Sequence, residues 1–242
     1  MQSQQTSAHM GMNRTGAKMS PIDVSAMEEY AASSPVSEFE GEDTMAAMRI
    51  EAIAEADTLG SVPLPGTLKG VMTTGVSMLK GDNPAMLIDK LGERLAFERT
   101  GTRLYEALIT KCMQLMPPGD PRLTILQRIH DQEAEHFQML AGALQSLGAD
   151  PTAQTPCADV SAQLSSGILQ VVTDPRTDLP QSLNAMLVAE LADNASWELL
   201  QTLLRQTGHD EMADSFGRAV TQEAEHVEAI RQMLEDSVMA AA

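Results

Sequence analysis

Apolar residues in the chain fall into four long stretches, in which they recur at alternating steps of three and four. This spacing places them on one face of an α-helix and is typical of bundle cores. The predicted helices cover 84–116, 121–148, 180–206 and 210–238. Asp82-Asn83-Pro84 and Asp120-Pro121 each join a capping side chain to a proline at the first helical position, and Gly208 closes the third helix. The pattern predicts an all-α fold.

The lengths of the joins predict how these helices are paired. Residues 117–120 and 207–209 are short joins, whereas 149–180 is long and has room for a short helix around 158–172. Two short joins predict two helical hairpins, and the long one predicts a crossover between them. Some four-helix bundles are connected in this way. We therefore expect a four-helix bundle domain over 82–242.

The first 81 residues lack the long periodic stretches. Residues 1–42 are rich in Ser, Gln, Met and Glu, and we expect them to be largely disordered. Residues 43–59 predict a short amphipathic helix that stops at Gly60. This helix either docks a partner or, as the plainer alternative, lies on its own domain. The sequence VPLPG at 62–66 and a Gly- and Thr-rich stretch at 67–81 then connect it to the bundle.

The amino-acid composition narrows the range of possible functions. Hydrophobic residues make up 43% and aromatic residues 3%, so the core must consist of Leu, Ile, Val, Met and Ala. The net charge of −18 repels phosphate backbones and argues against nucleic acid as a partner. Two cysteines provide neither a rubredoxin-like site nor a disulfide framework. The sequence has no apolar segment typical of a secretion signal and no apolar run long enough to span a membrane. We therefore expect a soluble cytoplasmic protein.

The inward faces of the four predicted helices are apolar except at one level. Each face carries a glutamate there, and two faces add a histidine three residues later: Glu98, then Glu133 and His136, then Glu190, then Glu223 and His226. The pentapeptide QEAEH supplies both Glu-x-x-His pairs, at 132–136 and again at 222–226. Within each pair the two side chains lie one turn apart on the same helical face.

Four carboxylates at one level of a core need compensation, because desolvating an unpaired charge costs at least several kcal/mol. Two divalent cations balance four carboxylates, and two neutral imidazoles complete the coordination. A metal-free bundle with protonated acids is the least favoured alternative. The pattern therefore predicts a dinuclear metal site.

This set of residues resembles the ligand set of the ferritin-like superfamily of carboxylate-bridged di-iron proteins, which includes bacterioferritin and rubrerythrin. The resemblance covers about residues 84–238 and does not explain the N-terminal third of the chain. It implies that Glu98 and Glu190 are terminal ligands, one for each ion. Glu133 and Glu223 would bridge the two ions, and His136 and His226 would each bind one ion.

The resemblance also draws attention to two aromatic residues. Tyr105 follows Glu98 by seven residues, where many members of the superfamily keep a tyrosine that bonds a ligand carboxylate, and it is the candidate catalytic residue. Trp197 is placed equivalently after Glu190 and can donate through its ring nitrogen. Alternatively, both simply fill core volume.

Two features depart from the superfamily pattern. Bacterioferritins carry Asp before each motif glutamate to orient a ligand histidine, whereas this chain has Gln132 and Gln222, which alters the expected surroundings of the metals. Asp193, one turn after Glu190, is similar to the extra carboxylate of rubrerythrin-like sites. It is a possible seventh ligand, a group that orients a ligand, or a substitute for Glu190.

Oxygen and nitrogen ligands from Glu and His suit iron(II) or manganese(II). With two Fe ions, the resemblance implies a di-iron oxidoreductase with ferroxidase or peroxide-scavenging activity towards dioxygen or hydrogen peroxide, in iron or oxidative-stress handling. Electrons would come from iron or from an external donor. The alternatives are a dimanganese catalase-like enzyme with two Mn ions, an oxidase of an organic substrate, and a non-enzymatic iron-binding or assembly protein. Two copies of such a bundle commonly associate, so we expect the protein to form a homo-oligomer, at least a dimer.

Overall fold

The computed structural model describes residues 15–16, 19–34, 40–64 and 84–240. Throughout these residues the regular structure is helical and contains no strand, which confirms the all-α prediction. The chain divides into two compact units, one formed by Ala8–Leu59 and a larger one that contains Gly60–Ala242. The predicted domain boundary between residues 81 and 82 lies outside the described residues.

The smaller unit contains α1 (Pro21–Ser33) and α2 (Glu40–Glu55). Pro21–Ser33 is thus a helix within the stretch 1–42 that we expected to be largely disordered. A proline in its first turn starts α1, since proline lacks only an N–H that has no partner there. The described part of α2 overlaps the helix predicted for 43–59 but stops at Glu55. Neither helix buries a described side chain within this unit.

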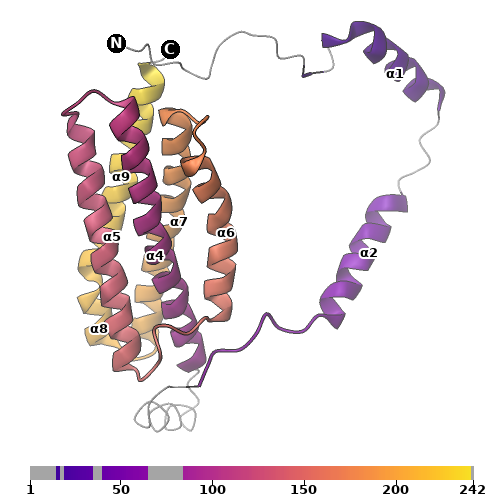
Figure 1. Ribbon diagram of the computed structural model, residues 1–242. Coiled ribbons are helices and arrows are strands. Elements are labelled where there is room, and N and C mark those ends of the chain that lie inside the picture. The colour runs from indigo at the N-terminus through magenta and orange to yellow at the C-terminus, as the bar shows by residue number, and fades with distance from the viewer. Residues whose placement is uncertain (1–14, 17–18, 35–39, 65–83, 241–242) are drawn as a thin grey trace. The chain divides into compact units, whose positions relative to one another are not determined.

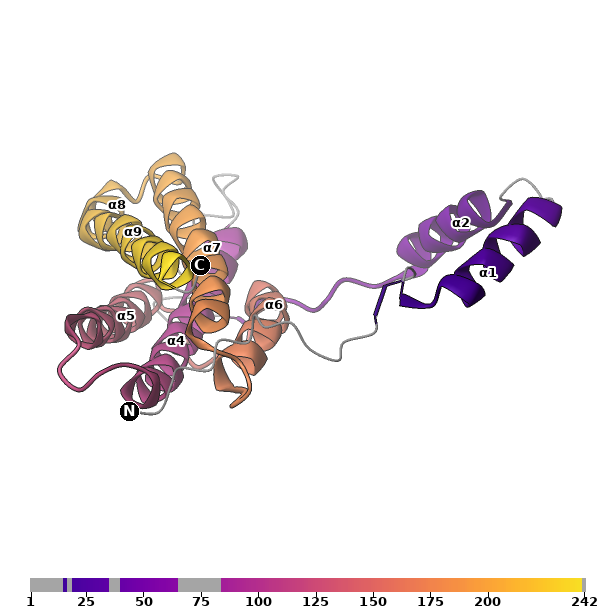
Figure 2. The ribbon, with the colours of Figure 1, turned by 90° about the horizontal axis from the view of Figure 1, so that it is seen from above.

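Over residues 84–240 the larger unit contains four long helices, one crossover helix and one short helix: α4 (Pro84–Leu115), α5 (Pro121–Ser146), α6 (Pro156–Thr173), α7 (Leu179–Gln206), α8 (Asp210–Ser215) and α9 (Gly217–Met239). The long helices lie side by side, with α5 against α4 and α9 against α7 (Figure 1). Seen along their axes, α6 lies outside them and packs on α4 and α7 (Figure 2). No described helix is both long and apolar enough to cross a membrane.

The ends of these helices follow from local chemistry. Asp120 accepts a hydrogen bond from the backbone N–H of Arg122 and caps α5, as the sequence predicts. Asp178 and Gln181 form a reciprocal capping box at the start of α7. Gly208 follows α7 with a φ of 75°, a left-handed conformation that favours glycine. The predicted cap at Asp82-Asn83 lies outside the described residues.

The predicted helix over 210–238 is interrupted, and this is a correction. Between α8 and α9, Phe216 has a φ of −82° and a ψ of −9°, in the right-handed helical region but with a ψ far from that of an ideal α-helix. The Ala213 carbonyl, which faces the N–H of Gly217 in an uninterrupted helix, accepts a hydrogen bond of 3.1 Å from the side chain of Gln201 on α7. A glycine at 217 also lowers helical propensity at the break.

The hydrophobic core is divided into two clusters along the long helices. One contains Leu104, Leu126, Leu183 and Ile230, and the other contains Leu91, Leu140, Leu200 and Phe216. On each long helix the acidic level of the sequence pattern lies between the residues of these two clusters. The apolar layers therefore isolate that level from solvent at both ends.

Candidate metal centre

The structure brings the six predicted ligands together in the middle of the core. Their ligand atoms form two groups, in each of which the atoms lie within 4.8 Å of one another. The first group consists of Glu98, Glu133, His136 and Glu223, and the second of Glu133, Glu190, Glu223 and His226. All six side chains are buried. Each group could hold a metal ion, and the two groups share two glutamates.

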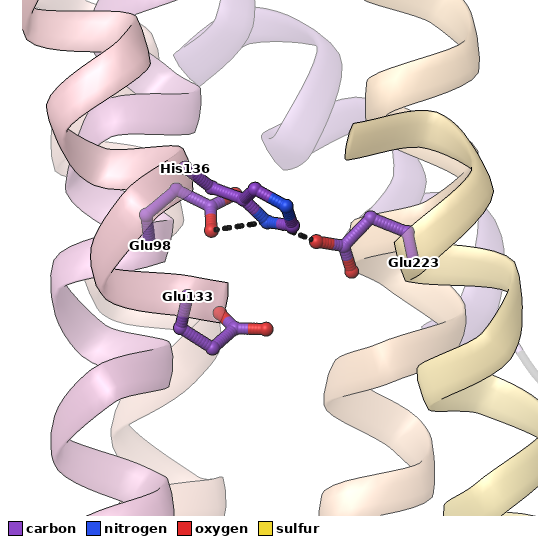
Figure 3. Close-up of side chains that lie close together, drawn as sticks. All are labelled: Glu98, Glu133, His136 and Glu223. Atoms are coloured by element: carbon purple, nitrogen blue, oxygen red, sulfur yellow. Dashed lines mark ion pairs between the residues drawn. The ribbon is translucent and has the colours of Figure 1, made fainter. Parts of the chain in front are cut away.

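Each side chain reaches the centre because of its place on a helix. Glu98 comes from α4 and Glu190 from α7, while α5 and α9 each supply a Glu-x-x-His pair. Figure 3 shows the first group, in which the side chains of three helices point towards one another. Side chains three residues apart share one face of a helix, which explains why both members of each pair converge.

The two oxygens of Glu223 face different histidines. Oε1 lies 2.7 Å from Nδ1 of His136, and Oε2 lies 3.5 Å from Nδ1 of His226. The shorter contact is close but is not directed as a hydrogen bond. The two imidazole rings are nearly parallel, with centroids 6.0 Å apart. Glu223 therefore lies between the two groups and offers one oxygen to each.

The atoms that face the centre have no hydrogen-bond partner among the described residues. These buried atoms are Oε2 of Glu98 and Glu190, both carboxylate oxygens of Glu133 and Glu223, and Nδ1 of His136 and His226. Buried polar atoms nearly always have a partner, because an unmet hydrogen bond in the core costs about 1–3 kcal/mol. Such a concentration of unpartnered ligand atoms at one point fits the donor set of a cation site.

The remaining carboxylate oxygens of the two lone glutamates are held by aromatic side chains. Trp197 Nε1 donates to Oε1 of Glu98 at 2.8 Å, and the Tyr105 hydroxyl donates to Oε1 of Glu190 at 2.6 Å. Tyr105 of α4 therefore reaches Glu190 on α7, and Trp197 of α7 reaches Glu98 on α4. Both are more than core filling, since each leaves its glutamate with one oxygen directed at the centre.

The glutamines of the two QEAEH motifs hold the histidines of the opposite motif. Oε1 of Gln222 lies 3.0 Å from Nε2 of His136, and Oε1 of Gln132 lies 3.0 Å from Nε2 of His226. With the amide oxygen as acceptor, Nε2 donates a proton to it, and Nδ1 is the ring nitrogen that can bind a cation once it has no proton. The repeated pentapeptide thus supplies both a ligand pair and the support for the other pair.

Protons reduce the negative charge of the centre when no cation is bound. Burial, together with the neighbouring carboxylates, holds the pKa values of Glu133 and Glu190 well above their usual range. Burial lowers the pKa of His136, but the carboxylates of Glu223 and Glu98 outweigh it and raise the pKa to about 10. Burial raises the pKa of Glu223, but the two histidines together have the larger effect and lower this pKa to about 2. Cation binding must therefore displace protons.

Asp193, the possible extra ligand, pairs with an arginine and is not among the grouped ligand atoms. Its carboxylate is buried and forms an ion pair with Arg94 of α4, and it belongs to neither group of ligand atoms. The hypotheses that it is a seventh ligand or a substitute for Glu190 are therefore not supported. Arg94 was not singled out from the sequence, although it lies one turn before Glu98 on the same helix.

Gly101 is a further residue that sequence reasoning missed. A Cβ atom at this position would lie 2.3 Å from Oε2 of Glu133, closer than any real contact. Glycine therefore lets the Glu133 carboxylate lie against the backbone of α4. The available signal was a glycine inside a long helix, three residues after Glu98.

A groove with a volume of about 710 Å³ runs between α5 and α9. Its lining includes Gln132 and Gln222, so these two side chains stand between the groove and the buried histidines. The charged residues Asp131, Glu135 and Arg218 lie along the same groove.

Comparison of this chain with models of known protein families, with curated proteins and with solved structures found no match.

Proposed function

We propose that this protein is a di-iron oxidoreductase built on a ferritin-like four-helix bundle, in which ferrous iron is oxidised by dioxygen or hydrogen peroxide. One observation carries the proposal: the number of unpartnered atoms on each glutamate. Glu98 and Glu190 each direct one oxygen at the centre, whereas Glu133 and Glu223 each direct two. This division is what two terminal and two bridging carboxylates require.

The ligand assignment follows from the same contacts. One ion would be held by Glu98 and His136, the other by Glu190 and His226, and Glu133 and Glu223 would bridge them. Four carboxylates balance two divalent cations, so the filled centre would be neutral. Oxygen and imidazole donors without thiolate favour iron(II) or manganese(II) over copper(I) or a structural zinc.

When bound there, two iron(II) ions supply two electrons to one oxidant. Reduction of hydrogen peroxide to two waters takes two electrons and two protons, so the two iron ions and two protons balance the step. The chain itself fixes the geometry and excludes bulk water by its apolar layers. Tyr105 holds Glu190 by donating its hydroxyl, and burial beside that carboxylate raises the pKa of the phenol well above its usual range. Tyr105 therefore keeps its proton and remains a donor to Glu190 at neutral pH.

The test is turnover by the purified full chain supplied anaerobically with a large excess of iron(II) over the two equivalents that fill the centre, because two iron(II) ions hold electrons for only one reduction of peroxide. We expect peroxide or dioxygen consumption well above that of iron(II) in buffer, and loss of this excess in the Glu133→Ala variant. Oxidation that stops after one event would contradict catalysis and favour an iron-binding protein. Catalase-like turnover seen only after loading with manganese(II) would contradict the choice of metal.

A further inference from the structure

The candidate centre is nearly symmetric, and one buried ion pair breaks the symmetry. Glu98 with its aromatic partner Trp197 corresponds to Glu190 with Tyr105, and each histidine has its glutamine at 3.0 Å. The Arg94–Asp193 pair occurs once. The two positions for cations therefore have similar ligands but different surroundings.

The equivalent positions on the opposite helices carry no charge. Arg94 precedes Glu98 by four residues, and the residue four before Glu190 is Met186, which is buried and apolar. Asp193 follows Glu190 by three residues, and the residue three after Glu98 is Gly101. The pair thus places a positive charge one turn from Glu98 and a negative charge one turn from Glu190.

Arg94 is closely associated with the Glu98 side of the centre. Its side chain is 3% exposed, so solvent screens its charge little. Burial lowers the pKa of Arg94, and among the carboxylates that raise it Glu98 has the largest effect. Its Nε is buried without a hydrogen-bond partner in the described part of the chain. The guanidinium remains charged because arginine keeps its proton in proteins.

Resting on the proposed dinuclear centre, we infer that the Arg94–Asp193 pair makes the two cation positions unequal, and that the position at Glu98 and His136 binds its ion more weakly. The two charges are in contact and partly cancel, so a nearby cation is affected by the charge that lies closer to it. The guanidinium is the member of the pair associated with Glu98, so it opposes a cation there. At an effective dielectric constant of about 20, the uncancelled part of such a pair a turn away changes affinity by roughly tenfold. Arg94 and Asp193 are therefore positioning residues that set the order of filling.

The experiment titrates the metal-free full chain with cobalt(II), followed by calorimetry and by visible absorption. Two ions at one centre repel each other, so unequal steps in the unaltered protein are not sufficient evidence. Single-position variants avoid this problem. We expect Glu98→Gln to keep one tight ion at Glu190 and His226, and Glu190→Gln to keep one ion bound at least about tenfold more weakly.

The second arm repeats both variants in an Arg94→Met, Asp193→Asn background, which removes the two charges together. There the two remaining affinities should agree within about threefold, whereas Arg94→Lys alone should preserve the difference. Equal affinities in the first arm, or an unchanged ratio in the second, would overturn the inference. If the double replacement does not fold by circular dichroism, Asp193→Asn alone takes its place and should widen the difference between the two affinities, because it leaves the guanidinium uncompensated. Absence of any cobalt binding by the unaltered chain would instead sink the proposed function itself.

Discussion

Two polar clusters lie inside the unit of Gly60–Ala242, and they differ in how their atoms are satisfied. Around Lys111 on α4, the ammonium donates to the carbonyl of Asp174, to the hydroxyl of Thr177 and to the hydroxyl of Ser182. A lysine has three donors, and all three are used. This cluster fastens the connection between α6 and α7 to α4 and has no ligand atom left to offer.

The cluster of six Glu and His residues has the opposite property. Its outer atoms are held by Trp197, Tyr105, Gln132 and Gln222, while its inner atoms face one another without hydrogen-bond partners among the described residues. A polar group with all its hydrogen bonds made stabilises the fold. Many buried polar atoms without hydrogen bonds at one place indicate a binding site for a cation. Substitutions at the two clusters should therefore have different consequences.

The largest effect is expected at the shared glutamates. Glu133→Ala or Glu223→Ala removes an oxygen donor from both groups, so each variant should lose both metal equivalents. Elemental analysis of protein expressed with iron and manganese measures this. Glu135→Ala is the matched control, because Glu135 lies on the same helix with an exposed side chain and should leave the metal content unchanged. Retention of one full equivalent in Glu133→Ala would refute the shared role of that glutamate.

Gly101→Ala should separate folding from metal binding. The added methyl meets the flexible end of Glu133, which can move away, so the helix should form normally or slightly better. The displaced carboxylate no longer lies in place, and metal affinity should fall by roughly tenfold or more. Titration with cobalt(II) and thermal unfolding check the two parts. Gly142→Ala, where a Cβ meets nothing within 4 Å, should change neither affinity nor metal content.

The metal-free protein should lose stability as the pH rises from about 5 to about 8. Glu133 and Glu190 have raised pKa values in the folded chain, so the unfolded chain releases their protons first and rising pH favours unfolding. His136, with its pKa raised to about 10, acts in the same direction above its ordinary range. Glu223, with its pKa lowered to about 2, stays ionised and adds no slope in this window.

Thermal unfolding after treatment with a chelator measures this dependence. The metal-loaded protein should show the opposite trend, because metal binding releases the same protons and strengthens as the pH rises. A melting temperature of the metal-free protein that is constant or rises across this range would contradict the proton balance at the centre.

The smallest effect is expected at the satisfied cluster. Lys111→Met removes the donor to Asp174, Thr177 and Ser182 and should lower the free energy of unfolding by about 1 kcal/mol. It should leave the metal content unchanged, since none of these residues contributes a ligand atom to either group. Denaturant unfolding and elemental analysis of the same sample measure both quantities. Loss of metal in this variant would show that the two clusters are not independent.

The sequence predicted the level of the core that holds the glutamates and histidines, because each of these glutamates interrupts the apolar face of its own helix. Asp193 lies on the same stripe and was indistinguishable from a ligand, since its partner Arg94 is 99 positions away in the chain. The break at Phe216 likewise depends on Gln201 of another helix, and the need for glycine at 101 depends on the Glu133 carboxylate. Periodicity identifies which face a residue occupies, whereas contacts between helices decide what it does there.

The most direct test of the central claim is the metal content of the unaltered full chain after expression with iron and manganese both supplied. Elemental analysis combined with amino-acid quantification gives the number of ions per chain. The unpartnered atoms of the two groups predict two divalent ions per chain. The proposed function predicts that these ions are iron, removed by a chelator and restored on adding iron(II). A protein that folds fully and binds no divalent ion, before or after reconstitution, would contradict the account.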